Sequence, residues 1–169
     1  MKKVMFYTIE TTKYVFSGSS LAHLNGKVVF VPFSLPNEKL KVEIVSEKKN
    51  YINAKIVEIL ESSPDRVNPK CKYFYLCGGC NMQMAKDEAQ RALRLLSVKD
   101  TFFKFHIETP IKMIFDKDWE YRARFQFHIF NEKLSLLGQK SSKMISITDC
   151  PVACKEIRTY LKTSPIFNN

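Results

Sequence analysis

Cysteines are the side chains of this sequence best suited to chemistry. Three of them, Cys71, Cys77 and Cys80, lie in the run CKYFYLCGGC, and Cys150 follows much later, directly before Pro151. Thiolates are soft ligands for zinc and for iron–sulfur clusters, and a late Cys-Pro is typical of many iron–sulfur sequences. The spacing favours a cluster held by these four cysteines, with structural zinc and a site without metal as the alternatives.

The other reactive side chains do not form a recognisable catalytic set. An odd count of five cysteines fits four ligands and one spare, so Cys154 is expected to be a buried, small apolar residue. His23, His106 and His128 have no arrangement of Ser, Cys or carboxylate partners that would make a triad. The sequence therefore predicts no catalytic residue and no residue that binds an organic cofactor.

Composition predicts a folded chain with a preference for polyanions. The 169 residues are 45% apolar and 26% charged, and 27 Lys and Arg against 17 Asp and Glu give a net charge of +10. A protein with this positive charge attracts polyanions such as nucleic acid. The alternative is that the lysines only form a solvated surface. The first residues, MKKVMFYTIE, lack the apolar run of a signal peptide, so a cytoplasmic protein without a membrane partner is expected.

Residues 1–62 are predicted to form a five-stranded, OB-like barrel. Short runs with alternating apolar residues are separated by turn signals such as Asn25-Gly26. The strands are expected at 4–10, 13–16, 27–33, 39–46 and 51–60. The proline-containing segment 63–70 is predicted to be a linker.

Residues 71–169 are predicted to form a small α+β domain around the four-cysteine metal site, which makes the chain a β-rich α+β protein. A helix is expected from about residue 84 to residue 104, covering a sheet of this domain with an apolar stripe. That sheet is expected to use the alternating stretch 121–129 and the strands 133–139 and 143–148. The stripe consists of Ala85, Ala89, Ala92, Leu96 and Phe103.

Basic residues on both predicted domains are candidate RNA contacts. Arg122 and Arg124 are two residues apart on a predicted strand, so both would point the same way and could bind successive phosphates. A solvated or ion-paired sheet face is one alternative, and neutralisation of the thiolates is another. On the barrel, a diffuse and salt-dependent RNA footprint is predicted for Lys27, Lys39, Lys41 and Lys55.

Several motifs together resemble the N-terminal half of the iron–sulfur RNA uracil-5 methyltransferases, which make 5-methyluridine in bacterial ribosomal RNA. The resemblance implies that the first domain is a TRAM domain, an RNA-binding barrel, and that the four cysteines hold a 4Fe-4S cluster with a mainly structural role. The matching segments, in order, are GKVVFVP (26–32), LPNEKLKVEI (35–44), SPDRVNPKC (63–71), CGGCNMQ (77–83), WEYRAR (119–124) and DCPV (149–152).

The sequence departs from the family pattern in two ways. Individual positions differ at Ser20, Asn37, Met84 and Asp87. In addition, only 19 residues follow Cys150, and no Gly-rich loop between a strand and a helix is present, so the family's S-adenosylmethionine-binding catalytic domain is not predicted in this chain. S-adenosylmethionine would enter only with a separately encoded methyltransferase domain.

The sequence thus predicts the RNA-binding recognition portion of a 23S rRNA-type uracil-5 methyltransferase, with ribosomal or transfer RNA as partner. It is not expected to be catalytic by itself, and whether it belongs to an enzyme is left open. The alternatives are a small iron–sulfur protein for electron transfer or redox sensing, and a zinc-dependent RNA-binding protein.

Overall fold

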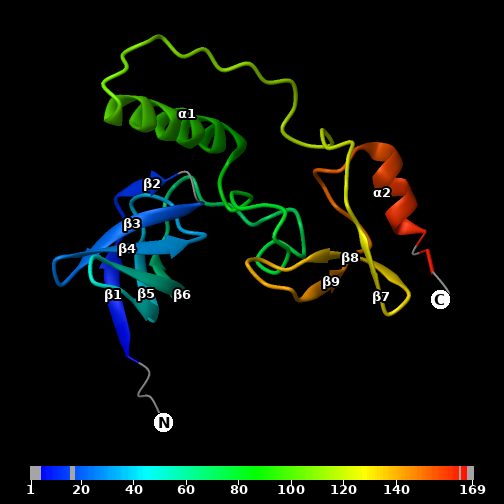
Figure 1. Cartoon of the computed structure of the whole chain (residues 1–169), viewed down its shortest axis with the longest axis horizontal. Helices are drawn as coiled ribbons and strands as arrows, with labels where there is room; N and C mark the ends of the chain where they lie inside the picture. The colour runs from blue at the N-terminus through cyan, green and yellow to red at the C-terminus, as the bar shows by residue number, and fades with distance from the viewer. Residues whose placement is uncertain (1–4, 16–17, 164, 167–169) are drawn as a thin grey trace. The chain divides into compact units, whose positions relative to one another are not determined.

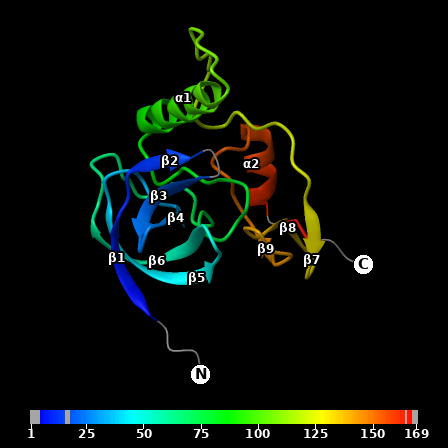
Figure 2. The same ribbon diagram turned by 60° about the vertical axis from the view of Figure 1, so that its left-hand side comes forward.

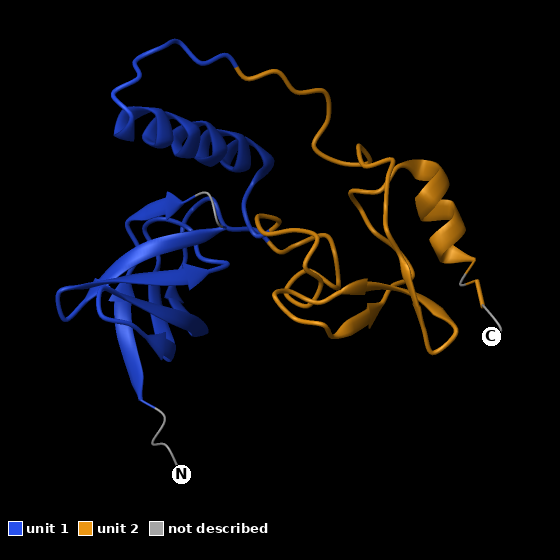
Figure 3. Ribbon diagram, viewed as in Figure 1, with its two compact units in different colours: residues 1–67, 84–112 blue, residues 68–83, 113–169 orange. Residues whose placement is uncertain are grey.

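The computed structural model describes residues 5–15, 18–163 and 165–166. Val4 and Phe16, each at one end of an expected strand, lie outside the described residues. The chain divides into two compact units, one of residues 1–67 with 84–112 and one of residues 68–83 with 113–169 (Figure 3). Residues 84–112 thus group with the N-terminal sheet, whereas the sequence assigned them to the second domain.

The first unit is built on one curled sheet of six strands in the order β1-β5-β6-β4-β3-β2 (Figures 1 and 2). The β4–β6 pair is parallel and the other pairs are antiparallel. The strands are β1 (Phe6–Glu10), β2 (Lys13–Val15), β3 (Ser19–Leu24), β4 (Lys27–Pro32), β5 (Lys39–Glu47) and β6 (Tyr51–Glu61).

Alternation along the strands places one apolar face in the core of this sheet. Along β4, Val29 and Val31 are buried while Val28 and Phe30 are only half-buried. A strand repeats every second residue, so this pattern puts one face inward and the other toward solvent. The buried set is Ile9, Ala22, Val29, Val31, Leu40, Val42, Ile52 and Ala54.

The predicted count of five strands is wrong, because β3 was not recognised in the sequence. Its first residues, Ser19 and Ser20, are polar but buried. Ser20 donates from its hydroxyl to the Ser34 carbonyl at 2.9 Å, and its N–H donates to the Ser34 hydroxyl at 3.2 Å. Buried serines with satisfied hydrogen bonds can line a core, yet they conceal the apolar alternation that identifies a strand.

Helix α1 (Asp87–Lys104) forms where it was predicted, and it groups with the first unit. It lies in the first unit, where Asp100 pairs with Lys13 of β2 at 2.7 Å. Ser97 is its one residue classed as buried, while Leu96 and Phe103 of the predicted stripe are 55% and 73% exposed. Among the described residues, no helix combines the length and the apolar character needed to cross a bilayer.

The second unit contains a three-stranded antiparallel sheet and one short helix. The elements are β7 (His128–Phe130), β8 (Lys133–Leu137), β9 (Met144–Ser146) and α2 (Lys155–Lys162). Asn131 and Glu132 both have positive φ, 48° and 62°, and make the tight turn between β7 and β8. The core contains Leu134, Ile145, Ile147, Cys150, Val152, Ala153 and Leu161.

The long strand predicted over residues 121–129 is reduced to β7. Upstream of β7 the backbone binds another segment: the Arg122 N–H donates to the Val152 carbonyl at 2.8 Å, and the Cys154 N–H donates to the Arg122 carbonyl at 2.9 Å. The chain around Arg122 is therefore held next to the segment that carries Cys150.

Candidate functional site

Close backbone packing positions the loop that carries Cys77 and Cys80. The Gly78 N–H donates to the Leu137 carbonyl at 3.0 Å, and the Gln139 N–H donates to the Leu76 carbonyl at 3.0 Å. A Cβ on Gly78 would lie 3.2 Å from the Gly138 carbonyl oxygen, which is backbone and cannot move aside easily. Glycine at position 78 therefore allows the cysteine loop to lie against the turn that follows β8.

The next residue, Gly79, makes a hydrogen bond to a cysteine sulfur atom. The Gly79 N–H donates to Cys77 Sγ at 3.4 Å. Such amide-to-sulfur bonds stabilise a thiolate and adjust the properties of a metal that it binds. The Gly78 N–H, in contrast, is bonded to the Leu137 carbonyl of β8.

Cys150 is buried and held by its own local hydrogen bonds. Its N–H donates to Asp149 Oδ1 at 2.8 Å, and its carbonyl accepts from the Ala153 N–H at 2.9 Å. The Tyr73 hydroxyl accepts from the Thr148 N–H at 3.1 Å, which ties the segment before Cys150 to the segment after Cys71. The two cysteine-bearing segments are thus connected although they are far apart in sequence.

Of the predicted ligands, Cys80 packs against the core cluster that contains Cys150. Burial raises the pKa of Cys150 to about 11, with a further contribution from Cys80 and Cys71. Burial also raises the pKa of Cys71, and Cys80 and Cys77 add to that shift. Cys154 is the fifth free thiol. Within the described part of the chain, no three His, Cys, Asp or Glu side chains are arranged closely enough to hold a metal ion as they stand.

Arg158 of α2 connects the segments around Cys150. Its Nε and Nη2 donate to Asp149 Oδ1 and Oδ2 at 2.9 and 3.0 Å, and its Nη1 donates to Glu120 Oε1 at 2.5 Å. The hydrogen bonds from Arg158 lower the pKa of Asp149, so this carboxylate stays ionised. The bidentate pair fixes Asp149, which in turn accepts the Cys150 N–H.

We expect Arg158→Met to weaken metal binding by about 10-fold to 100-fold, as the loss of a residue that orients a ligand usually does. Methionine keeps much of the apolar packing of the side chain but removes both ion pairs. Competition with a chelator measures the affinity. The control is Arg124→Met, whose exposed side chain makes no such pair; an equal loss in both variants would contradict the positioning role of Arg158.

Arg122 and Arg124 do not form the predicted pair on one strand face. The Arg122 guanidinium lies over the Phe125 ring at 4.5 Å, and its Nε donates to the Arg124 carbonyl at 3.2 Å. Its Nη1 would be 3.7 Å from a Cβ on Gly79, beside the cysteine loop. The reason is the irregular backbone of residues 121–127, which removes the two-residue repeat that would align both side chains. Their contact with RNA stays a prediction.

Each of the four barrel lysines predicted to bind RNA has a glutamate partner. Lys27 pairs with Glu47 at 2.6 Å and Lys55 pairs with Glu43 at 2.8 Å. Lys39 and Lys41 meet Glu61 and Glu58 at 3.2 and 3.9 Å, respectively. Such exposed pairs are weak and exchange readily with other ions, but they offset the positive field along β5 and β6.

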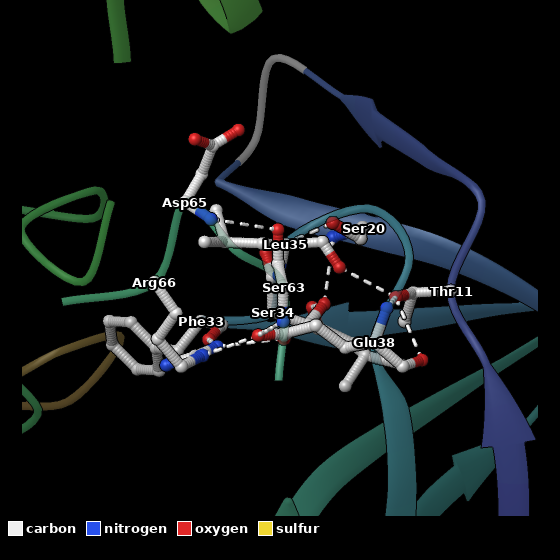
Figure 4. A network of polar contacts seen from close by, with 10 residues as sticks. Thr11, Ser20, Phe33, Ser34, Leu35, Glu38, Ser63, Asp65 and Arg66 are labelled. Carbon is white, nitrogen blue, oxygen red and sulfur yellow. Dashed lines mark hydrogen bonds and ion pairs between the residues drawn. The ribbon is translucent and has the colours of Figure 1, made fainter. Parts of the chain in front are cut away.

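A buried ion pair connects the end of the sheet to the segment that leaves it (Figure 4). The Glu38 carboxylate accepts from the Leu35 N–H at 2.9 Å, from the Ser63 N–H at 3.3 Å, and from both Nε and Nη2 of Arg66. Arg66 Nη2 also donates to the Phe33 carbonyl at 2.8 Å. Glu38 lies in LPNEKLKVEI (35–44) and Arg66 lies in SPDRVNPKC (63–71), two of the segments that resemble the methyltransferase family. The ion pair therefore joins these two segments.

Sequence reasoning did not identify Glu38, Arg66, Tyr73 or Arg158 as structural partners. Apart from Leu35, which is three residues from Glu38, their partners are between 9 residues away, for Arg158 and Asp149, and 75 residues away, for Tyr73 and Thr148. Local spacing does not reveal these distant partners. The usable signal was the proline-flanked position of Glu38 and Arg66, in LPNE and SPDR. A charged residue in such a short turn often binds nearby backbone amides.

Comparison with known proteins gives concordant matches. Residues 7–57 match the TRAM domain family. An "Uncharacterized RNA methyltransferase" of Treponema denticola is 47% identical over 92% of this chain and 43% of its own length. The "23S rRNA (uracil(1939)-C(5))-methyltransferase RlmD" of Shewanella sediminis is 34% identical over 89% of this chain and 36% of its own length.

A solved structure shares the fold. The tRNA (uracil-54, C5)-methyltransferase of Pyrococcus abyssi, in complex with S-adenosyl-L-homocysteine, superimposes with a TM-score of 0.61 at 23% identity, over 91% of this chain and 35% of that chain. This chain spans less than half the length of each of these three proteins. Residues 7–57 thus form a TRAM domain, and over most of its length the chain is a relative of proteins named as RNA methyltransferases.

Proposed function

We propose that this chain is the RNA-binding portion of a uracil-5 methyltransferase system. Its TRAM sheet would bind ribosomal or transfer RNA in the cytoplasm, and its second unit would hold a 4Fe-4S cluster. The observation that carries the proposal is the coincidence of the TRAM match, residues 7–57, with the six-stranded sheet of a chain of net charge +10. Methyl transfer would require S-adenosylmethionine and catalytic groups from a further domain.

The proposal of an iron–sulfur cluster in the second unit rests on the chemistry of its thiols. Cys71, Cys77, Cys80 and Cys150 would be the ligands, because thiolates are the usual ligands of such clusters, and the Gly79 amide bonded to Cys77 Sγ supports this assignment. The cluster would supply a cross-link between the loop and the segment around residue 150. Metal binding would then contribute to the folding of this small unit.

Crosslinking in bacterial cells tests the RNA partner. The tagged chain is irradiated in cells, purified under denaturing conditions, and the attached RNA is sequenced. We expect ribosomal RNA to be enriched over messenger RNA relative to an untagged control, because the Shewanella sediminis relative is named as a 23S rRNA methyltransferase. Enrichment of transfer RNA would change the target, and recovery of no RNA above background would contradict the function.

A further inference from the structure

Strands β3, β4 and β6 are neighbours in the sheet (Figure 2). Their outward face carries aromatic side chains in adjacent positions. In the strand register, Val28 of β4 lies between His23 of β3 and Tyr51 of β6. The next outward row places Phe30 between Leu21 and Asn53. The row between them, Ala22, Val29 and Ile52, is buried in the core, so both outward rows face away from it.

Two of these rings are held in a defined geometry. Phe30 and Tyr51 have ring centroids 5.8 Å apart and planes at 89°, an edge-to-face contact. In such a contact one ring contributes only its edge, so its faces are not covered by the other. Tyr51 is 39% exposed and His23 is also exposed. The rings therefore form an exposed aromatic surface. Phe30 and Tyr51 already have a fixed geometry, so they need no rearrangement before a ligand binds there.

Two lysines lie beside this surface. Lys48 and Lys49 are exposed in the turn before Tyr51, and no ion pair among the described residues involves either of them. The Lys48 N–H donates to the Tyr51 carbonyl at 2.8 Å, so the turn and the ring are connected. This differs from the side of β5 and β6, where Lys39, Lys41 and Lys55 face glutamates.

We infer that His23, Phe30 and Tyr51 form a platform on which unpaired nucleobases of single-stranded RNA stack, while Lys48 and Lys49 bind the adjacent phosphates. Bases stack on exposed aromatic rings without strong sequence preference, and lysines beside the rings follow the backbone. This inference rests on the proposed RNA binding and assigns it to one face of the TRAM sheet. The glutamate-paired lysines would then contribute less than Lys48 and Lys49.

The test measures binding of a fluorescently labelled single-stranded RNA to the full chain by anisotropy at several salt concentrations. Tyr51→Ala is expected to weaken binding by about 10-fold, since stacking on one ring contributes on that scale, and Tyr51→Phe is expected to bind as the unmodified chain does. Tyr51→Ala should leave the salt dependence unchanged, whereas Lys48→Gln with Lys49→Gln should make it less steep. Tyr160→Ala, an exposed tyrosine on α2, is the matched control and should have no effect.

The outcomes separate this inference from the proposed function. If the unmodified chain binds RNA but Tyr51→Ala and Phe30→Ala, both still folded by circular dichroism, bind equally well, the platform is wrong and the function stands. If the unmodified chain prefers a duplex of the same sequence, stacking is also wrong, because paired bases are not accessible. Loss of self-association in Tyr51→Ala with unchanged RNA affinity would assign the face to a second copy of the chain. Absence of any RNA binding would overturn both proposals.

Discussion

Glu38→Gln is expected to lower the free energy of unfolding of the first unit by about 3–5 kcal/mol, the range found when one partner of a buried ion pair is removed. The Glu38 side chain is 0% exposed and that of Arg66 is 12% exposed. The glutamine amide nitrogen would direct its N–H donors at the Arg66 guanidinium and at one of the two backbone N–H groups, which are themselves donors. Arg66 would keep its charge without a carboxylate to offset it.

Urea unfolding followed by circular dichroism measures this effect. The control is Glu43→Gln on β5, because Glu43 pairs with the exposed Lys55 and its loss should cost less than about 1 kcal/mol. Glu38→Gln combined with Arg66→Gln should be less destabilising than the sum of the single changes, since the two residues act as a pair. A loss below 1 kcal/mol for Glu38→Gln would mean that the network in Figure 4 is not important for stability.

Cys150→Ser is expected to remove at least about nine-tenths of the iron bound by the anaerobically purified chain. A serine hydroxyl is a poor substitute for a thiolate, and only three thiolates would remain. Because metal binding contributes to folding, the second unit should also become more sensitive to proteases. Iron and sulfide analysis together with limited proteolysis measures both effects.

Cys154→Ser provides the matched control for this prediction. Cys154 lies four residues after Cys150 at the N-cap of α2, where serine is a favourable residue. We expect its iron content to be unchanged. Equal losses in both variants would contradict the assignment of Cys150 as a ligand, and stoichiometric zinc in place of iron would keep the four ligands but change the metal.

The sequence predicted most of the first sheet because its apolar residues alternate. Along β5, Leu40 and Val42 are buried and alternate with the half-buried charged residues Lys39, Lys41 and Glu43, as the pattern indicated. Asn25 and Gly26 have positive φ, 51° and 76°, and make the expected turn. Strand β3 was missed because its buried serines satisfy their polar groups by hydrogen bonds to Ser34, a residue of a later segment.

The second unit was harder to predict because long-range backbone bonds decide its structure. Alternation over residues 121–129 indicated a strand, but residues near 120 bond to the segment 151–154, and only β7 pairs with β8. The connections made by Arg158 and Tyr73 also join segments that are distant in the chain. The predicted ligands Cys71, Cys77 and Cys80 were chosen by their local spacing and Cys150 by the proline that follows it, and their role as ligands stays a prediction.

Equilibrium binding of the purified full chain to single-stranded RNA, at about 50 mM and about 200 mM salt, tests the central claim most directly. The account predicts binding that weakens steeply with salt, with a slope of roughly 0.7 per phosphate contacted in a plot of log affinity against log salt concentration. Binding that is absent at the lower salt concentration would contradict the claim that this chain is an RNA-binding module.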